Sequence, residues 1–252
     1  MRRSSFSGRQ KVFFTLLALV AVIPQPAWAG PPFMTDDPEP TETGHWEIYG
    51  PLIEAEGRGR DVDGAAGAEI NFGAARNLQL TLGLPVAFAH DSDGWRGGAG
   101  DIEMSAKYRF IHDEASGLQV AAFPGITLPT ASHGMGAGHV TALLPVWAQK
   151  DIGRWSIFGG AGYALNPGAG NRNYWTGGIA VSRQMNERDL MGLELDRSGA
   201  GEVGGHATTS FGLGIIHQLH KPFRLLASGG PVIEDGTGKT GFHCFLALGI
   251  DY

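Results

Sequence analysis

The chain has no long hydrophobic run beyond residue 29, and it is poor in charge and in cysteine. Charged residues make up only 17% of its 252 positions, although 42% are hydrophobic. Because a membrane-spanning helix needs roughly 20 consecutive apolar residues, a helical membrane protein is excluded. The single cysteine, Cys244, excludes an intramolecular disulfide. The net charge of −6 argues against a nucleic-acid partner.

Residues 1–29 have the features of a secretory signal peptide. Basic residues precede an uncharged apolar run over residues 12–23, which is too short to span a membrane. Ala27-Trp28-Ala29 then forms a small-residue cleavage site. No cysteine follows this site, which argues against a lipoprotein. We therefore expect the protein to be exported, with a mature chain that begins at Gly30.

The residues that are abundant point to β-structure. Glycine occupies 40 positions, about twice the usual fraction. Apolar residues occupy every second position of the terminal stretch FHCFLALGIDY, from Phe242 to Tyr252. Strict alternation predicts a strand with one apolar and one mixed face. The stretch is also as long as a tilted membrane-spanning strand, and it ends on an aromatic residue, as the terminal strands of bacterial outer-membrane barrels do.

The stretch over residues 101–111 shows why a soluble sandwich fits poorly. Four charged residues, Asp101, Glu103, Lys107 and Arg109, share one face, whereas the other face is apolar. A dry core cannot bury four charges at an acceptable energetic cost. The pattern instead favours a wall between lipid and a polar lumen.

We count about twelve such strands, separated by alternating short and longer glycine-rich connections. This arrangement predicts an all-β, antiparallel transmembrane barrel of twelve strands, with ten as the fallback. Pro85, Pro124 and Pro145 fall inside expected strands, where they indicate bulges or wrong boundaries. The expected strands are residues 45–56, 66–73, 77–89, 101–111, 118–128, 140–148, 155–165, 174–185, 190–196, 207–218, 223–232 and 242–252.

The domain organisation follows from the strands. Residues 45–252 are expected to form the barrel, and residues 30–44, rich in Pro and Asp, a periplasmic tail or a plug in the lumen. The acidic residues Asp36, Asp37 and Glu39 belong to this segment, which lacks the spaced ligands of a calcium loop. The expected lumen-lining residues are Glu69, Asn71, Gln79, Thr81, Asp101, Glu103, Lys107, Arg109, Glu194 and Asp196.

The mature chain resembles a known family of small outer-membrane barrels. PPFMTDDPEP (residues 31–40), GHWEIY (44–49), GDIEMSAKYRF (100–110) and LPVWAQKDIGRW (144–155) resemble the putative meta-pathway of phenol degradation family. The motifs are structural, and no catalytic signature is carried over. The resemblance implies passive uptake of small, aromatic or hydrophobic compounds across the outer membrane of a Gram-negative cell.

Two classes of function remain open. The barrel is either a channel for small molecules or a non-conducting structural or surface-binding barrel, closed by lumen charges and the N-terminal segment. A lipid hydrolase is a remote alternative: His206 and Ser210 would share a strand face, but the H-x-S-N-G stretch of outer-membrane phospholipase A is absent. We expect no enzyme activity, metal or cofactor, and as partners the bilayer, the outer-membrane assembly machinery and a small-molecule substrate.

The terminal strand generates a prediction about assembly. Deletion of Tyr252, or the substitution Tyr252→Asp, should impair insertion because the aromatic end of the last strand is part of the insertion signal. Heat-modifiable folded protein in the outer-membrane fraction provides the measurement. A normal amount of folded protein after either change would contradict the role of the terminal strand.

Overall fold

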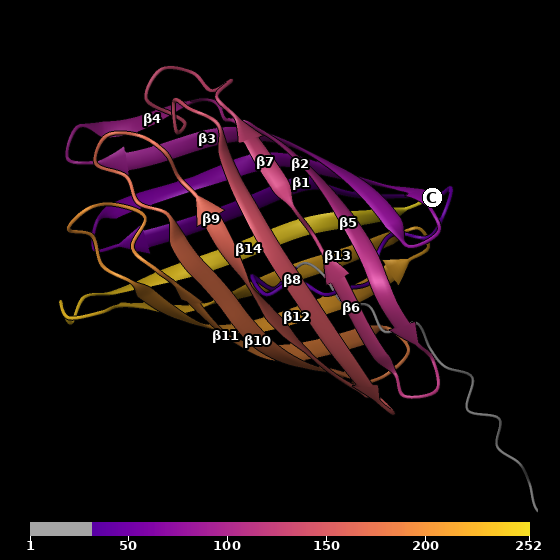
Figure 1. Ribbon diagram of the computed structural model, residues 1–252. Helices are drawn as coiled ribbons and strands as arrows, with labels where there is room; N and C mark the ends of the chain where they lie inside the picture. The colour runs from indigo at the N-terminus through magenta and orange to yellow at the C-terminus, as the bar shows by residue number, and fades with distance from the viewer. Residues whose placement is uncertain (1–31) are drawn as a thin grey trace, which may run out of the picture.

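Most of residues 32–252, the part of the chain that the computed structural model describes, lie in β-strands joined by turns and loops. The signal peptide expected over residues 1–29 lies outside the described residues. Among residues 32–252, no helix is long and apolar enough to cross a membrane. The strands are tilted and wrap into one closed antiparallel barrel, with the long loops at one end and the C-terminus at the other (Figure 1).

The strands are β1 (Trp46–Arg58), β2 (Asp61–Ala75), β3 (Leu78–Asp91), β4 (Gly94–Ala99), β5 (Ile102–Asp113), β6 (Leu118–Ala122), β7 (Gly125–Leu128), β8 (Thr141–Ile152), β9 (Trp155–Leu165), β10 (Tyr174–Gln184), β11 (Asp189–Ser198), β12 (Thr208–His220), β13 (Phe223–Glu234) and β14 (Thr240–Asp251).

Two pairs of these segments are single wall strands with an interruption. β4 and β5 pair with successive parts of β3, and β6 and β7 both lie between β5 and β8. The wall therefore has twelve strands, which confirms the predicted number. The barrel is closed because β1 pairs with both β2 and β14, and β3 pairs with β5.

The prolines that were awkward in the sequence lie at the interruptions. Pro124 separates β6 from β7, and Pro145 of β8 faces that gap, where its carbonyl accepts a hydrogen bond from Phe123 N at 3.1 Å. Pro85 of β3 faces the gap between β4 and β5, where its carbonyl accepts from Gly100 N at 2.9 Å. A proline has no N–H to donate, so it is tolerated where the neighbouring strand is already broken.

Two connections expected as loops are tight hairpins instead. β1 and β2 remain paired up to Arg58 and Asp61, so the expected loop over residues 57–64 shrinks to Gly59 and Arg60. The expected loop over residues 90–100 is mostly β4. Glycine indicated loops here, but Gly59 has a φ of +66°, a conformation suited to a tight turn between long strands.

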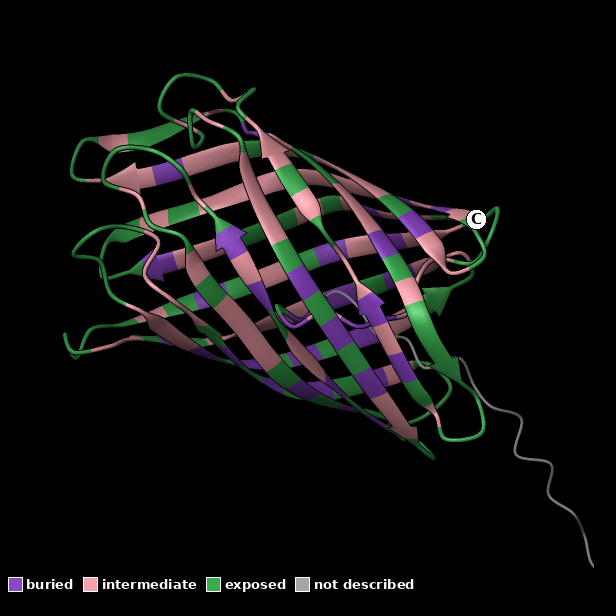
Figure 2. Ribbon diagram, in the orientation of Figure 1, coloured by how far each residue is buried: buried purple, intermediate pink, exposed green. Residues whose placement is uncertain are grey.

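The alternation of side chains puts apolar residues on the outside of the barrel. In β11, Leu193 is 64% exposed, whereas its neighbour Glu194 is 5% exposed and faces the interior. The same alternation of exposed and buried positions runs along the neighbouring strands (Figure 2). A water-soluble protein has polar residues outside and apolar residues inside, whereas this wall has the opposite distribution. It matches the apolar band of a barrel in lipid.

The two faces of β3 provide a test of the register. Leu82 pairs with Met104 on the outer face, whereas Thr81 donates a hydrogen bond to Asn71 Oδ1 at 2.6 Å on the inner face. An arginine at the midplane of the outer face should cost about 2–4 kcal/mol. We expect Leu82→Arg to lower the free energy of unfolding much more than Thr81→Arg, measured by urea titration in lipid vesicles. Equal costs at the two positions would mean that the register is wrong.

Candidate functional site

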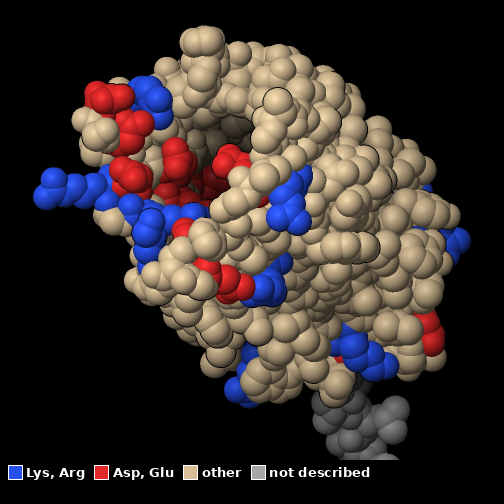
Figure 3. Space-filling view, turned by 60° about the vertical axis from the view of Figure 1, so that its left-hand side comes forward, with Lys and Arg blue, Asp and Glu red and all other residues tan. Residues whose placement is uncertain are grey.

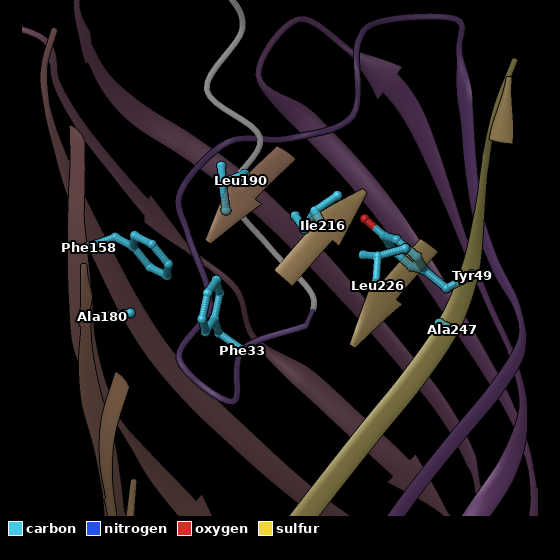
Figure 4. Close-up of a cluster of buried hydrophobic side chains, with 8 residues drawn as sticks. All are labelled: Phe33, Tyr49, Phe158, Ala180, Leu190, Ile216, Leu226 and Ala247. Carbon is cyan, nitrogen blue, oxygen red and sulfur yellow. The ribbon is translucent and has the colours of Figure 1, made fainter. Parts of the chain in front are cut away.

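The segment that precedes β1 runs through the interior of the barrel. Phe33, Thr35 and Asp37 on this segment are buried, with exposures of 8%, 0% and 0%. Phe33 points toward Phe158 of β9, and their ring centroids are 5.7 Å apart (Figure 4). The segment is therefore packed against the wall of the lumen.

Hydrogen bonds and one ion pair hold the segment against opposite sides of the wall. Thr35 N donates to Glu194 Oε2 on β11 at 3.0 Å, and Thr41 N donates to Gln79 Oε1 on β3 at 2.8 Å. Lys107 Nζ on β5 lies 3.0 Å from Asp36 Oδ1. Ser228 Oγ on β13 donates to the Pro32 carbonyl. Contacts to β3 and β5 on one side of the barrel and to β11 and β13 on the other fix the segment across the lumen.

The packing of the Phe33 ring against the inner wall depends on two glycines. A Cβ atom at Gly192 would lie 2.6 Å from the Phe33 ring, and one at Gly214 would lie 2.5 Å from it. Any larger residue would displace the ring. Because these two positions of β11 and β12 have no side chain, the inner wall leaves room for the Phe33 ring.

Four of the residues expected in the lumen form one hydrogen-bonded network on β2 and β3. Gln79 Nε2 donates to Asn71 Oδ1 at 2.8 Å, and Thr81 Oγ1 donates to the same oxygen at 2.6 Å. Asn71 Nδ2 in turn donates to Glu69 Oε1 at 2.9 Å. The network gives this part of the inner wall a fixed polar surface.

The two acidic residues near the start of β5 have different surroundings. Asp101 Oδ1 and Oδ2 accept hydrogen bonds from Ala131 N and Ala137 N at 2.9 and 2.8 Å. Asp101 therefore holds the loop between β7 and β8 against the barrel. Glu103 is exposed on the inner face and lines an interior cavity.

The basic residues of β5 have partners outside the expected lumen-lining set. That set contains acidic residues such as Glu69, Glu194 and Asp196, but Lys107 pairs with Asp36 of the N-terminal segment. Arg109 donates to the amide oxygens of Gln119 and Asn77. Lys107 meets Asp36 because the N-terminal segment passes through the lumen beside β5.

Glu194 and Asp196 lie on the inner face of β11, where both are 5% exposed. Glu194 Oε2 accepts the hydrogen bond from the N-terminal segment, whereas its Oε1 has no hydrogen-bond partner among the described residues. Asp196 is paired with Ser210 across β11 and β12. The acidic pair thus borders the seat of the N-terminal segment.

Two interior cavities, each of about 560 Å³, flank the N-terminal segment. The first runs along β1, β2 and β14, and the second lies beside β5, β7 and β8. Met34, Asp36 and Phe123 border both cavities. The long-loop end of the barrel is hollowed, with acidic side chains gathered on the inner wall of the opening (Figure 3).

Several residues of the first cavity are absent from the expected set. Glu54 and Glu56 on β1 and Asp63 on β2 line it. The alternation Leu52, Glu54, Glu56 could have identified two of them. The irregular register between Tyr49 and Leu52 hides the common face, and Asp63 falls where a loop was expected. Near the opposite end, Arg224 pairs with Glu47 and lies 3.2 Å from Asp251 Oδ1.

The buried carboxyl groups of the N-terminal segment are poorly solvated. Burial raises the pKa of Asp37 to about 8, against the opposing charge of Lys107. Burial likewise raises the pKa of Glu39 to about 7. Neither residue lies on a membrane-spanning strand. The docked segment therefore favours the neutral form of Asp37 near neutral pH, whereas Glu39 titrates there.

The fold is shared by known outer-membrane proteins. The COG4313 outer membrane channel from Pseudomonas putida F1 superposes with a TM-score of 0.66 at 13% identity, over 86% of this chain and 98% of that chain. The KdgM porin superposes with a TM-score of 0.54 at 12% identity, over 82% of this chain and 98% of the porin. The translocator domain of the autotransporter NalP from Neisseria meningitidis superposes with a TM-score of 0.53 at 14% identity, over 82% of this chain and 88% of that domain.

Comparison of the sequence itself gives no match. No protein-family model and no curated protein matches the chain, so membership of the phenol-degradation family stays a prediction. The structural comparisons show that this chain has the fold of small outer-membrane barrels.

The raised pKa of Asp37 predicts that docking of the segment depends on pH. A released Asp37 would titrate near 3.8 and the docked one near 8, so the docked form binds more protons. The docked form of the segment is therefore most stable below about pH 4, and its stability relative to the released form decreases as the pH rises through about 8. We expect a spin label at Met34→Cys, in a Cys244→Ser background, to become more mobile between pH 5 and pH 9.

Two variants control this experiment. Asp37→Asn keeps the side chain neutral and should reduce the pH response of the label to the part that comes from Glu39. Glu42→Gln removes an exposed carboxylate from the same segment and should leave the response unchanged. An unaltered pH response in Asp37→Asn would assign the change to another group.

Proposed function

We propose that this chain is an outer-membrane barrel through which small solutes diffuse, along a path narrowed by the N-terminal segment. The first cavity carries the proposal. It extends along β1 from Glu56, near the loop end, to Glu47, near the C-terminal end. A polar cavity that follows most of one strand through a closed barrel is suited to the passage of a small solute.

The surroundings of the barrel follow from its outer face. The exposed apolar residues of the wall need a lipid bilayer as their solvent, and the terminal strand offers the signal for the outer-membrane assembly machinery. Export by a cleaved signal peptide belongs to the same proposal. The outer-membrane channels and porins that share the fold support this location.

The size of the barrel favours a narrow channel for small molecules. Eight strands enclose a space that side chains fill, whereas sixteen leave an open aqueous pore, so twelve lie between these limits. The resemblance to the phenol-degradation family suggests small aromatic or hydrophobic compounds. The apolar side chains of Phe33, Met34 and Phe245 along the first cavity support that size and class.

A non-conducting barrel is the second candidate, favoured by the attachments of the N-terminal segment. Phe33 is buried, and hydrogen bonds to Gln79 and Glu194 tie the segment to opposite walls. The lipid-hydrolase alternative has less support. Ser210 is 4% exposed on the inner wall, away from the outer surface where a lipid substrate would lie, and His206 precedes β12.

Conductance in planar bilayers tests the proposal. The mature protein should show small, discrete current steps, and Phe33→Ala should enlarge them. Removal of a packed phenylalanine side chain typically costs about 3–5 kcal/mol, which weakens the docked state of the segment. Phe242→Ala removes the same side chain from the outer face, where Phe242 is 47% exposed, and should leave the conductance unchanged.

The two candidate functions give different results in this experiment. No current in the mature protein, in Phe33→Ala or in a variant that lacks residues 31–41 would establish the non-conducting barrel. Current only in the two variants would assign the segment as a closed plug rather than a constriction.

A further inference from the structure

The first cavity is strongly acidic. Eight carboxylate side chains line it, whereas its basic lining residues are one lysine and one histidine. The carboxylates extend from Glu54, Glu56 and Asp63 on the wall to Asp37 and Glu39 on the N-terminal segment. An enclosed space lined by charge of one sign concentrates ions of the opposite sign.

Internal ion pairs neutralise only part of this charge. Lys107 pairs with Asp36 at 3.0 Å, Arg58 pairs with Glu56 at 2.7 Å, and Arg224 pairs with Glu47. Among residues 32–252, the other five carboxylates of the cavity form no ion pair. Glu54 is one of them, and its side chain also forms no hydrogen bond within that part of the chain.

Asp37 gives a second, independent indication of a missing ligand. Its side chain is fully buried and lines the cavity. Oδ1 accepts a hydrogen bond from Glu39 N at 2.6 Å, whereas Oδ2 has no hydrogen-bond partner among the described residues. An unsatisfied buried carboxylate oxygen is costly, and a donor in the cavity would remove that cost. Burial raises the pKa of Asp37 to about 8, although the charge of Lys107 opposes the shift.

Aromatic side chains lie next to the unpaired carboxylates. Glu54 on β1 and Phe245 on β14 are register partners on the inner face, and Phe33 and Tyr49 border the same cavity. Phe245 packs against the buried apolar cluster, so its ring is held in place. A ring beside a carboxylate offers an apolar surface and a cation–π contact to one ligand.

We propose that the first cavity binds small organic cations, in which an ammonium group is joined to an apolar or aromatic body. The ammonium group lies among Asp37, Glu54 and Asp63, and the apolar body lies against Phe33 and Phe245. If the barrel conducts as proposed above, it passes such cations in preference to carboxylates of the same size.

Three probes with the same aromatic body and different charge test the site: benzylammonium, benzyl alcohol and benzoate. Calorimetric titration of the folded mature protein in detergent should show that benzylammonium, which can also donate a hydrogen bond to Asp37 Oδ2, binds at least about tenfold more tightly than benzoate. Equal binding of the three probes, or tighter binding of benzoate, would overturn the proposal.

Two variants locate the binding. Glu54→Gln combined with Asp63→Asn should abolish most of the preference for the cation. Glu187→Gln removes one exposed carboxylate from the turn between β10 and β11, outside the cavity, and should change nothing. An equal loss of the preference for the cation in the double variant and in Glu187→Gln would mean that the cation binds to the general surface charge. That result would overturn the site.

Bilayer recordings separate this proposal from the channel proposal. In a salt gradient, the reversal potential of a conducting barrel should have the sign set by cations, and millimolar benzylammonium should reduce the current. Current with anion selectivity would overturn the cation proposal and leave the channel. Selective binding of the cation without any current would overturn the channel and support the site.

Discussion

Closure of the sheet is the constraint on which the rest of the structure depends. A strand in lipid has no water to satisfy its backbone groups, so each wall strand must have a neighbour on both sides. The pairing of β1 with β14 supplies the last neighbours, and the two ends of the barrel chain meet where Trp46 and Tyr252 exchange backbone hydrogen bonds of 2.9 Å. Closure also decides where irregularities are tolerated, since Pro85 and Pro145 face the two places where a neighbouring strand is interrupted.

A closed barrel of twelve strands has an interior that its own wall side chains do not fill. The N-terminal segment occupies part of this space, and small wall residues such as Gly192 and Gly214 make room for Phe33. Polar attachments on separated strands then hold the backbone of the segment. What remains are two cavities divided by the segment, so the segment both stabilises the interior and defines the width of any path through it.

Charge is distributed unevenly along the lumen. Glu54, Glu56 and Asp63 lie toward the loop end, whereas Arg109 and Arg224 lie toward the C-terminal end, close to amide or carboxylate oxygens. Arg224 is paired with carboxylates and Arg109 is hydrogen-bonded to side-chain amides, while carboxylates remain without ion pairs in the first cavity. A solute that enters from the loop end meets a negative potential, which links the proposed channel to the proposed selection of cations.

The sequence by itself determined the strand number and the face of each residue on the regular strands, because a period of two follows directly from the geometry of a strand. Leu82 and Thr81 could be assigned to opposite faces without any knowledge of their neighbours. Only the tertiary structure decided which inner residues meet. Lys107 and Asp36 are far apart in the chain, and they pair because the barrel closes around the N-terminal segment. The irregular register after Tyr49 likewise decides that Glu54 and Glu56 face the lumen. Contacts of this kind depend on the closure of the barrel, on the register of its strands and on the path of the N-terminal segment, which has no periodic pattern. Local sequence patterns carry no information about these three features.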